Sequence, residues 1–475
     1  MFLCREEELS KLNKRYAGDR FECVVIYGRR RVGKTALINK FREDKPTIFF
    51  SALNSTALDN LEALSKVIYN YEHPESMDSP VYHSFDAAFE AISRIGREER
   101  IVFVIDEYPY LAKADLSISS RLQHLMDHVW NDSHIFLILC GSSMSFMENQ
   151  VLGYESPLYG RRTAQFKVEA LSYLDSAKFY PNLSLEDNAL IYGITGGIPH
   201  YLNKLDVKGD LDTAILMNIM DRSAYLYEEP ENLLKQELRE PALYNAIIKA
   251  VAGGASRQNE IALKSGLTSA LCAKYLNVLM ELGIISKETP ISEKPGKKTV
   301  YHVSDNFFRF WYRYVANNIA AIASGRINRI YANAIKPSYS DYMGLIFEKM
   351  CKEYLLFYAE RLPVEIKSVG QWWGTDPKAR KEIQIDIVAP SSDENEYIIG
   401  SCKFRNAKTD LDEYWLLRDY ASVFAKGKQC YFYIFSKSGF TEELLKEAKR
   451  GEVKLLSLND LYSAPALLTS QPLML

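Results

Sequence analysis

The chain has 475 residues, too many for one ordinary domain, so several domains are expected. Hydrophobic residues make up 47% and charged residues 25%, the balance of a globular protein with a large core. A formal net charge of −3 excludes a protein that is basic overall, so any nucleic-acid-binding surface must be local.

The N-terminus and the cysteines favour a cytoplasmic protein with no membrane partner. Residues 1–8 carry acids where a signal peptide has an apolar core. No run of the sequence approaches the about 18 apolar residues of a membrane span. The 7 cysteines are scattered and lack C-x-x-C pairing, which argues against a disulfide framework or a zinc site.

The most specific motif runs from Gly28 to Thr35 and fits G-x-x-x-x-G-K-[ST], the phosphate-binding P-loop. An apolar, β-branched run precedes it and a helix-compatible run follows it, which is the order this loop requires. Lys34 is placed to reach the β- and γ-phosphates, and the Thr35 hydroxyl to bind Mg²⁺. ATP and Mg²⁺ are the expected ligands, and the predicted binding residues are Gly28, Arg29, Arg30, Arg31, Val32, Gly33, Lys34 and Thr35.

A second element of the nucleotide site is the apolar run 101–105, which predicts a buried parallel strand ending in Asp106 and Glu107. Asp106 is a candidate Mg²⁺ ligand, and Glu107 is a candidate catalytic residue that polarises the attacking water. The alternative is a core strand that meets a charged loop. The P-loop upstream favours the functional interpretation, because both elements hold one metal–nucleotide complex.

A third strand is predicted over 134–140 and is followed by hydroxyl side chains. Ser142 is a candidate contact to the γ-phosphate, and Ser143 is a second candidate. An ordinary Gly-Ser turn after a strand explains the same residues equally well.

The first 170 residues alternate strands and helices, which predicts an α/β P-loop core. Residues 171–238 are predicted to be mostly helical, with glycines and a proline at 196–199 between two helices. Either this segment forms a lid over the nucleotide, or it is a helical corner without nucleotide contact.

Residues 239–305 predict a winged helix, with helices over 242–251, 257–262 and 270–283, and strands over 284–288 and 298–303. DNA contact and a protein–protein or intramolecular role both stay open, because phosphate contact needs several basic residues. The candidates for DNA contact are Lys274, Lys294, Lys297 and Lys298. Residues 306–340 form a predicted helical connector, whose aromatic stripe is expected to pack a domain interface.

Residues 341–475 predict a second α/β domain. It carries Glu348 on a helix, Asp386 in a strand and Lys403 at the end of the next strand. This order is the ground plan of a PD-(D/E)xK nuclease, in which carboxylates hold Mg²⁺ and the lysine helps to activate water. Ser401 stands where a second strand acid is expected, and a hydroxyl is a weak Mg²⁺ ligand. Glu382 is a possible substitute, but we expect a nuclease-like fold that is retained for binding or scaffolding.

With these segments in order, the chain resembles archaeal and bacterial P-loop ATPases of the AAA superfamily that end in a restriction-nuclease-like domain. The resemblance rests on Arg5 to Leu9, Gly28 to Thr35, Ile105 to Glu107, Leu139 to Ser143, Leu158 to Thr163, Gly196 to Pro199, and the set Glu348, Asp386 and Lys403.

The resemblance implies that the Arg5 segment lies near the adenine and that the helical segment 171–238 is a lid. It also implies that Arg161 or Arg162 reaches a γ-phosphate, in cis or from a neighbouring subunit, so self-association is a candidate. Surface ion pairs are the alternative for these two arginines.

The leading hypothesis is a Mg²⁺-dependent ATPase that couples nucleotide state to the winged helix and the nuclease-like domain. A nucleotide-gated signalling switch with little turnover is the first alternative. A DNA-processing factor with a degenerate nuclease domain is the second.

Overall fold

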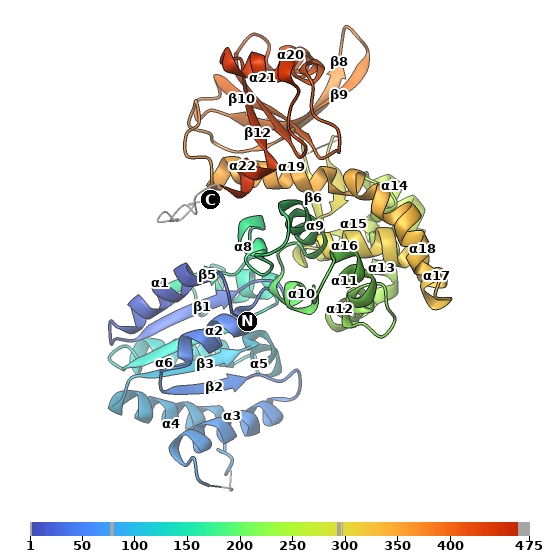
Figure 1. Ribbon diagram of the computed structural model, residues 1–475. Coiled ribbons are helices and arrows are strands. Elements are labelled where there is room, and N and C mark those ends of the chain that lie inside the picture. Colours follow the sequence, from blue (N-terminus) through green and yellow to red (C-terminus); the bar gives the residue numbers. More distant parts are fainter. Residues whose placement is uncertain (1, 77–79, 292–295, 297, 464–475) are drawn as a thin grey trace. The chain divides into compact units, whose positions relative to one another are not determined.

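The computed structural model describes residues 2–76, 80–291, 296 and 298–463, and the chain divides into two compact units (Figure 1). The first unit runs up to Leu171 and includes the short segments Ile198–Asn203 and Glu281–Gly283. The second unit contains Ser172–Gly197, Lys204–Met280 and the chain from Ile284 onward. Within the described residues, no helix is long and apolar enough to cross a membrane.

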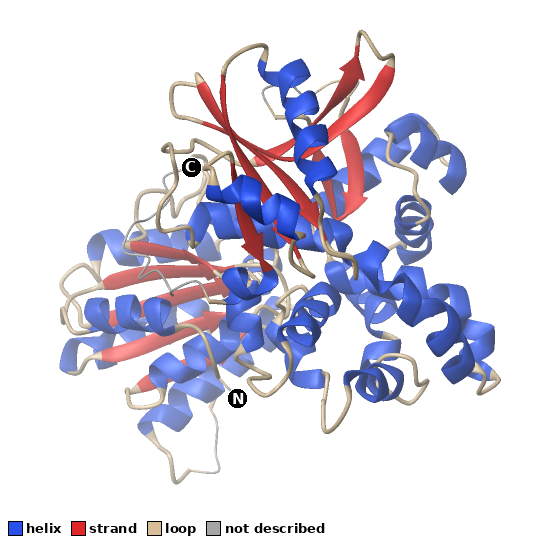
Figure 2. Ribbon diagram, turned by 45° about the horizontal axis from the view of Figure 1, so that its top comes forward, coloured by secondary structure: helices blue, strands red, loops and turns tan. Residues whose placement is uncertain are grey.

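The first unit is built on a parallel five-stranded sheet in the order β2-β3-β4-β1-β5 (Figure 2). Its strands are β1 (Glu22–Tyr27), β2 (Thr47–Ser51), β3 (Ile101–Asp106), β4 (Ile135–Gly141) and β5 (Ala164–Lys167). Its helices are α1 (Glu6–Tyr16), α2 (Lys34–Arg42), α3 (Ala57–Glu72), α4 (Phe85–Glu98), α5 (Tyr108–Ala114), α6 (Ile118–His128) and α7 (Met144–Phe146).

The central strands are apolar except for Glu22 at the start of β1 and Asp106 at the end of β3, because both faces of the sheet are covered by helices. Every residue of β1, β3 and β4 is buried. Successive β1 side chains enter separate clusters, with Val24 and Ile26 on one side and Cys23 and Val25 on the other. The continuous apolar runs in the sequence therefore correspond to central parallel strands.

Gly28 is required where β1 ends and the P-loop begins. A Cβ atom at this position would lie 2.2 Å from the Val168 carbonyl oxygen, and the residue has φ +157°. The chain after β5 is held there by a backbone hydrogen bond from Val168 N to Tyr27 O of 2.7 Å. Only glycine permits this close approach of two backbone segments.

The second unit begins with α8 (Tyr173–Ala177), α9 (Leu185–Thr195), α11 (Leu211–Asn218) and α12 (Glu229–Glu237), while α10 (Pro199–Lys204) lies almost wholly in the first unit. Next come α13 (Pro241–Ala252), α14 (Gln258–Ser265), α15 (Ser269–Glu281) and the antiparallel pair β6 (Ile285–Glu288) and β7 (Val300–Val303). The short helices α16 (Asn306–Phe310), α17 (Ile319–Ala323) and α18 (Ile327–Ile330) follow.

The C-terminal part of the second unit holds a mixed five-stranded sheet in the order β12-β11-β10-β9-β8. Strands β8 to β10 pair antiparallel and β10 to β12 pair parallel. The strands are β8 (Gly370–Asp376), β9 (Lys381–Pro390), β10 (Glu396–Lys403), β11 (Gln429–Ser436) and β12 (Val453–Ser457). The helices are α19 (Tyr339–Phe357), α20 (Leu411–Ala425), α21 (Glu442–Lys449) and α22 (Leu458–Tyr462).

Four predicted segments belong to one compact unit, apart from residues 198–203 and 281–283. They are the predicted lid, winged helix, connector and nuclease-like domain. The reason is a buried polar and aromatic junction. The Tyr342 hydroxyl of α19 donates to the carbonyls of Gly193 (2.8 Å) and Asn306 (3.1 Å). The Asn306 amide donates to the Tyr192 carbonyl at 3.1 Å. The aromatic stripe 307–315 is largely buried in this unit.

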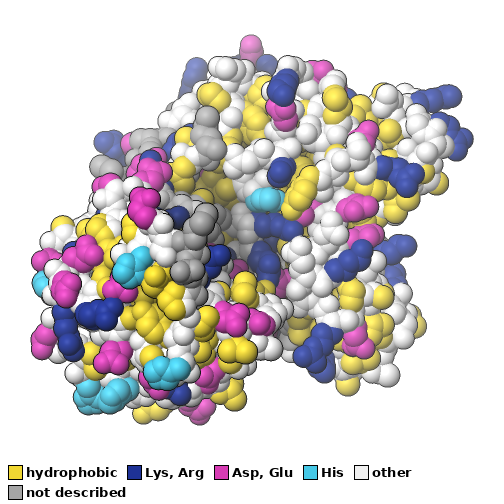
Figure 3. All heavy atoms as spheres, turned by 90° about the horizontal axis from the view of Figure 1, so that it is seen from below, with side chains coloured by type: hydrophobic (Ala, Val, Ile, Leu, Met, Phe, Trp, Pro, Cys, Tyr) yellow, Lys and Arg dark blue, Asp and Glu magenta, His cyan; other side chains and the backbone are white. Residues whose placement is uncertain are grey.

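Both signs of charge are spread over the surface. On the face seen in Figure 3, acidic, basic and apolar side chains are interspersed over the first unit, with no continuous patch of one sign. This agrees with the formal net charge of −3.

Glu353 of α19 predicts how stability depends on pH. Burial raises the pKa of Glu353 to about 7, although Lys349 and a hydrogen bond from the Tyr192 hydroxyl oppose the shift. Because the folded-state pKa lies above the unfolded value of about 4.5, this residue costs stability progressively as pH rises from about 4.5 to 7. Glu353→Gln should therefore leave the melting temperature near wild type at pH 5 and raise it by about 3 °C at pH 8.

Thermal melts at both pH values test this prediction. Glu360→Gln, at an exposed position of the same segment, is the control and should show no pH-dependent difference from wild type. An equal shift of Glu353→Gln at both pH values would contradict the prediction.

Candidate functional site

The P-loop connects the end of β1 to α2 and folds around its own lysine. The Lys34 ammonium donates to the carbonyls of Gly28 (2.8 Å) and Arg29 (3.0 Å). Gly33 adopts φ +93° at the N-terminus of α2, so its backbone turns in a way that other residues rarely adopt. Burial lowers the pKa of Lys34, whereas Cys140, Glu107 and Asp106 oppose that shift. Its charge therefore lies in a mostly dry site beside two acids.

The two acids at the end of β3 face the P-loop. The Thr35 hydroxyl donates to the Asp106 carboxylate at 3.1 Å, which joins α2 to β3. Asp106 also accepts the Glu107 N–H at 3.0 Å. Glu107 has φ +51°, in the left-handed region that is strained for a residue with a side chain. This backbone turn aims the Glu107 carboxylate away from the strand direction.

Ser142, at the end of β4, orients Glu107. Its hydroxyl lies 2.9 Å and 3.2 Å from the two carboxylate oxygens of Glu107 and donates to that carboxylate. The contact of Ser142 to the γ-phosphate stays a prediction, and in the structure its hydroxyl contacts the acid beside the P-loop. The adjacency of β3 and β4 explains this contact, and it is not visible in the linear sequence.

A second group of polar side chains in the second unit lies around the middle of β9 and the end of β10. The Cys402 N–H donates to Asp386 at 2.9 Å, and the Lys403 ammonium lies 3.9 Å from the same carboxylate. The Gln371 amide donates to Glu348. Burial, together with the charge of Asp386, raises the pKa of Glu348 to about 8. The three residues predicted as a degenerate nuclease-like set are thus brought near one another.

Glu413 of α20 is the member of this cluster that sequence reasoning missed. Its carboxylate accepts the Ser401 hydroxyl at 2.8 Å and lies 3.0 Å from the Lys403 ammonium. Although burial opposes it, Asp386 and Glu413 raise the pKa of Lys403. Glu382 is exposed and lies elsewhere on β9, so the acid that joins Asp386 beside Ser401 comes from the helix α20. Within the described residues, no group of three or more His, Cys, Asp or Glu is close enough to hold a metal ion.

Residues 2–205 match a family described as an ATPase domain predominantly from Archaea. Residues 311–413 match a family described as archaeal and bacterial proteins of unknown function. An uncharacterized protein of Methanocaldococcus jannaschii is 33% identical over 422 residues, which is 88% of this chain and 91% of that protein. The chain belongs to this family of archaeal ATPase-domain proteins.

Two further proteins show a more distant similarity. An uncharacterized ATP-binding protein of Pyrococcus horikoshii is 23% identical over 237 residues, which is 42% of this chain and 73% of that protein. A solved Walker-type ATPase of Pyrococcus abyssi gives a TM-score of 0.51 at 19% identity, over 66% of this chain and 96% of that chain. The predicted α/β P-loop ATPase core is confirmed at the level of family and fold. The nuclease-like nature of the C-terminal domain stays a prediction.

The arginines predicted near the nucleotide have different surroundings in this ATPase core. The Arg161 guanidinium forms a two-point ion pair with Asp127, at 2.8 Å to each oxygen, and donates to the carbonyls of Pro157 and Tyr159. Arg162 lies near β1, where its charge acts on Cys23 and Tyr27. Arg5 donates to the carbonyls of Val32 and Glu169, so it ties the N-terminus to the P-loop. The ion pair of Arg161 favours the structural alternative for that residue.

The predicted lid segment contributes one element to the ATPase unit. The His200 N–H of α10 donates to the Arg31 carbonyl at 3.4 Å, and the Pro199 ring lies 3.9 Å from a Cβ built on Gly33. Of the candidates for DNA contact, Lys274 is exposed on α15 and Lys298 is exposed before β7. Lys294 and Lys297 lie outside the described residues.

The hydrogen bond between Ser142 and Glu107 leads to a prediction about ATP turnover. Ser142→Ala should lower kcat about tenfold and leave KM for ATP unchanged, because it removes a contact that orients an acid but does not bind nucleotide. Steady-state phosphate release measures both constants. Ser143→Ala is the matched control and should retain wild-type kcat, whereas equal losses in the two variants would refute the role of Ser142.

Proposed function

We propose that this protein binds and hydrolyses ATP at the P-loop of the first unit. The observation that carries the proposal is the hydrogen bond of 3.1 Å between Thr35 and Asp106, which joins the P-loop to the strand that carries the acids. The match of residues 2–205 to an ATPase family and the relative described as ATP-binding support it.

Each residue of the site has a distinct role in this proposal. Lys34 exchanges its two carbonyl partners for the β- and γ-phosphate oxygens of ATP and balances their charge. Glu107, oriented by Ser142, accepts a hydrogen bond from the water that attacks the γ-phosphorus. The bond between the γ-phosphorus and the β–γ bridging oxygen breaks, which yields ADP and phosphate. A neutral or misplaced side chain at 107 would leave binding intact and slow this step.

Two oxygen donors of the site fit Mg²⁺. Thr35 and Asp106 supply a hydroxyl and a carboxylate that lie together, and Mg²⁺ in such sites takes few protein ligands and keeps several waters. The ion would neutralise phosphate charge.

We further propose that ATP state controls the second unit. In this proposal residues 171–238 act as a lid, and α13 to α15 with β6 and β7 act as a winged helix that contacts DNA through Lys274 and the wing. The order of three helices followed by an antiparallel strand pair supports the winged-helix assignment. Arg162, or Arg161 after release from Asp127, would reach a γ-phosphate, in cis or in a self-associated form.

The main proposal predicts that two substitutions in the nucleotide site both lower phosphate release but differ in their effect on ATP affinity. Glu107→Gln should lower phosphate release at least about 100-fold and retain ATP affinity, because water activation is lost and phosphate binding is not. Lys34→Ala should lose both. Phosphate release with and without DNA, together with ATP binding by filter retention, measures the two properties.

Glu90→Gln is the control for this experiment, because Glu90 is an exposed acid of the same unit. Turnover by Lys34→Ala equal to that of wild type would refute the proposed site. A single slow turnover with retained ADP would instead favour a nucleotide-gated switch, and turnover that requires DNA would favour a DNA-processing factor.

A second candidate function is phosphodiester cleavage in the C-terminal domain. The specific observation in its favour is the position of Glu413, whose carboxylate shares the Ser401 hydroxyl and the Lys403 ammonium with Asp386. Two carboxylates suffice for Mg²⁺ when substrate phosphates complete the shell. In this proposal Glu413 takes the place of the acid that the nuclease motif has at the position of Ser401.

Cleavage of a labelled oligonucleotide in the presence of Mg²⁺ tests the second candidate. If it holds, Asp386→Asn and Glu413→Gln should each lower the rate at least about 100-fold, because either change removes one of the two anionic oxygens. Asp412→Asn, at the exposed neighbouring position, should cleave like wild type. No cleavage by the wild-type protein, or equal cleavage by Glu413→Gln, would leave the domain with a binding or scaffolding role.

A further inference from the structure

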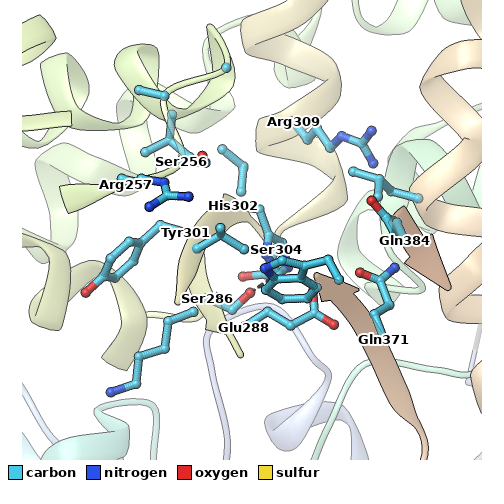
Figure 4. A pocket seen from close by; sticks show the side chains of 18 of the residues that line it. Ser256, Arg257, Ser286, Glu288, Tyr301, His302, Ser304, Arg309, Gln371 and Gln384 are labelled. Carbon is cyan, nitrogen blue, oxygen red and sulfur yellow. Dashed lines mark hydrogen bonds between the residues drawn. The ribbon is translucent and has the colours of Figure 1, made fainter. Parts of the chain in front are cut away.

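A cleft with a volume of about 1100 Å³ lies within the second unit (Figure 4). Its walls come from the end of α13 and the following turn, from β6 and β7, from α16 and α19, and from β8 and β9. This volume is at or above the upper end of the about 300–1,000 Å³ that is typical of small-molecule pockets. We call it the basic cleft, for the side chains described next.

Among the charged side chains that line the basic cleft, most are positive. The basic lining residues are Arg257, Lys287, Lys298, Arg309, Arg313, Lys349 and Lys352, and the acidic ones are Glu288 and Glu382. Glu288 is paired with Lys352 at 3.5 Å. Because the chain as a whole carries a net charge of −3, this concentration of cations is local. A concave, cationic surface attracts a polyanion.

The basic residues surround the cleft and are not gathered on one wall. Figure 4 shows Arg257 on one side and Arg309, Gln371 and Gln384 on the other, with His302, Ser286 and Glu288 between them. His302 lies 2.8 Å from the Ser286 hydroxyl. Burial lowers the pKa of His302, and Arg309, Lys352 and Lys349 act in the same direction against Glu288.

Two aromatic side chains also line the cleft. Trp373 comes from β8 and Tyr301 from β7. The preceding residue of β8, Trp372, packs against Phe424 of α20 with ring centroids 5.3 Å apart. Since neighbouring strand residues face opposite sides of a sheet, Trp373 lies on the cleft side. Aromatic side chains in a positively charged groove provide surfaces on which bases stack.

The cleft adjoins the polar cluster through one hydrogen bond. Gln371 lines the cleft and donates to Glu348 of the cluster. Glu382 and Gln384 of β9 also line the cleft, but the pairing of β9 with β8 shifts in register between Ile385 and Val388, so strand alternation does not place Asp386 on their face.

We propose that the basic cleft binds a single strand of nucleic acid, with phosphates at Lys287 and Lys349 and a base on Trp373. A duplex is less suited, because proteins read it with a helix or ribbon that projects into a groove, whereas these cations line a concavity. The proposal stands apart from ATP hydrolysis and from cleavage, since it needs neither the P-loop nor the acids of the cluster. DNA and RNA strands share the required chemistry.

Fluorescence anisotropy of the full chain tests the proposal, with fluorescein-labelled 20-nucleotide DNA and RNA strands and a 20-base-pair duplex as probes. K287E/K349E should bind either single strand at least about tenfold more weakly at 0.1 M KCl, because two phosphate contacts become repulsive. The slope of log affinity against log salt should fall by about 1.4. W373A should weaken binding about fivefold or more, and W373F should restore it.

The matched control is K446E/K449E, which changes the same charge at exposed positions of α21 and should bind single strands like wild type. Lys34→Ala should also bind like wild type, and K287E/K349E should retain nucleotide-dependent turnover measured without nucleic acid, so failure of the ATPase proposal is distinguishable from failure of this one. Tighter binding of the DNA strand or of the RNA strand identifies the type of nucleic acid that the cleft prefers and supports the proposal. Binding of the duplex alone, equal losses in K287E/K349E and K446E/K449E, or no binding of either strand would overturn it.

Discussion

The nucleotide site depends on one constraint, the parallel order of buried strands that brings the carboxyl ends of β1, β3 and β4 to the same edge of the sheet. Each strand contributes one part at that edge: the P-loop after β1, the acids at the end of β3 and Ser142 after β4. Two side-chain hydrogen bonds, from Thr35 to Asp106 and from Ser142 to Glu107, then join these parts across the sheet. A parallel sheet can supply this convergence because its strands all point to one edge, where ligands of α/β folds bind.

The sequence predicts those features of the site whose residues lie close together in the chain. The P-loop and the strand ending in Asp106 and Glu107 are recognisable because their chemistry is contiguous in the chain. The contact of Ser142 with Glu107 is not, because it depends on β4 lying beside β3. The same holds for Arg161, whose partner Asp127 lies on α6 and is invisible to a motif. Local patterns therefore identify the elements, and the packing of those elements decides which side chains meet.

The second unit shows why domain boundaries are hard to read from sequence. Changes in composition and pattern predict four separate segments, namely a lid, a winged helix, a connector and a nuclease-like α/β domain. Yet α9, α16 and α19 share buried hydrogen bonds through Tyr342 and Asn306, so the segments pack as one body. The basic cleft arises from this packing, since its cations come from segments far apart in the chain. Its excess of basic over acidic residues is invisible in a net charge of −3, which sums charges without regard to position.

The polar cluster of the C-terminal sheet also depends on contacts between segments that are distant in the chain. The motif assigns an acid to a fixed place in a strand, and this chain has Ser401 there. A metal or a phosphate, however, responds to where a carboxylate lies and not to which element carries it. Glu413 reaches Ser401 and Lys403 from α20, because that helix packs against the face of the sheet on which Ser401 and Ile399 lie. The fold thus places a helix acid beside the strand position at which the motif expects one, and the linear sequence does not reveal this.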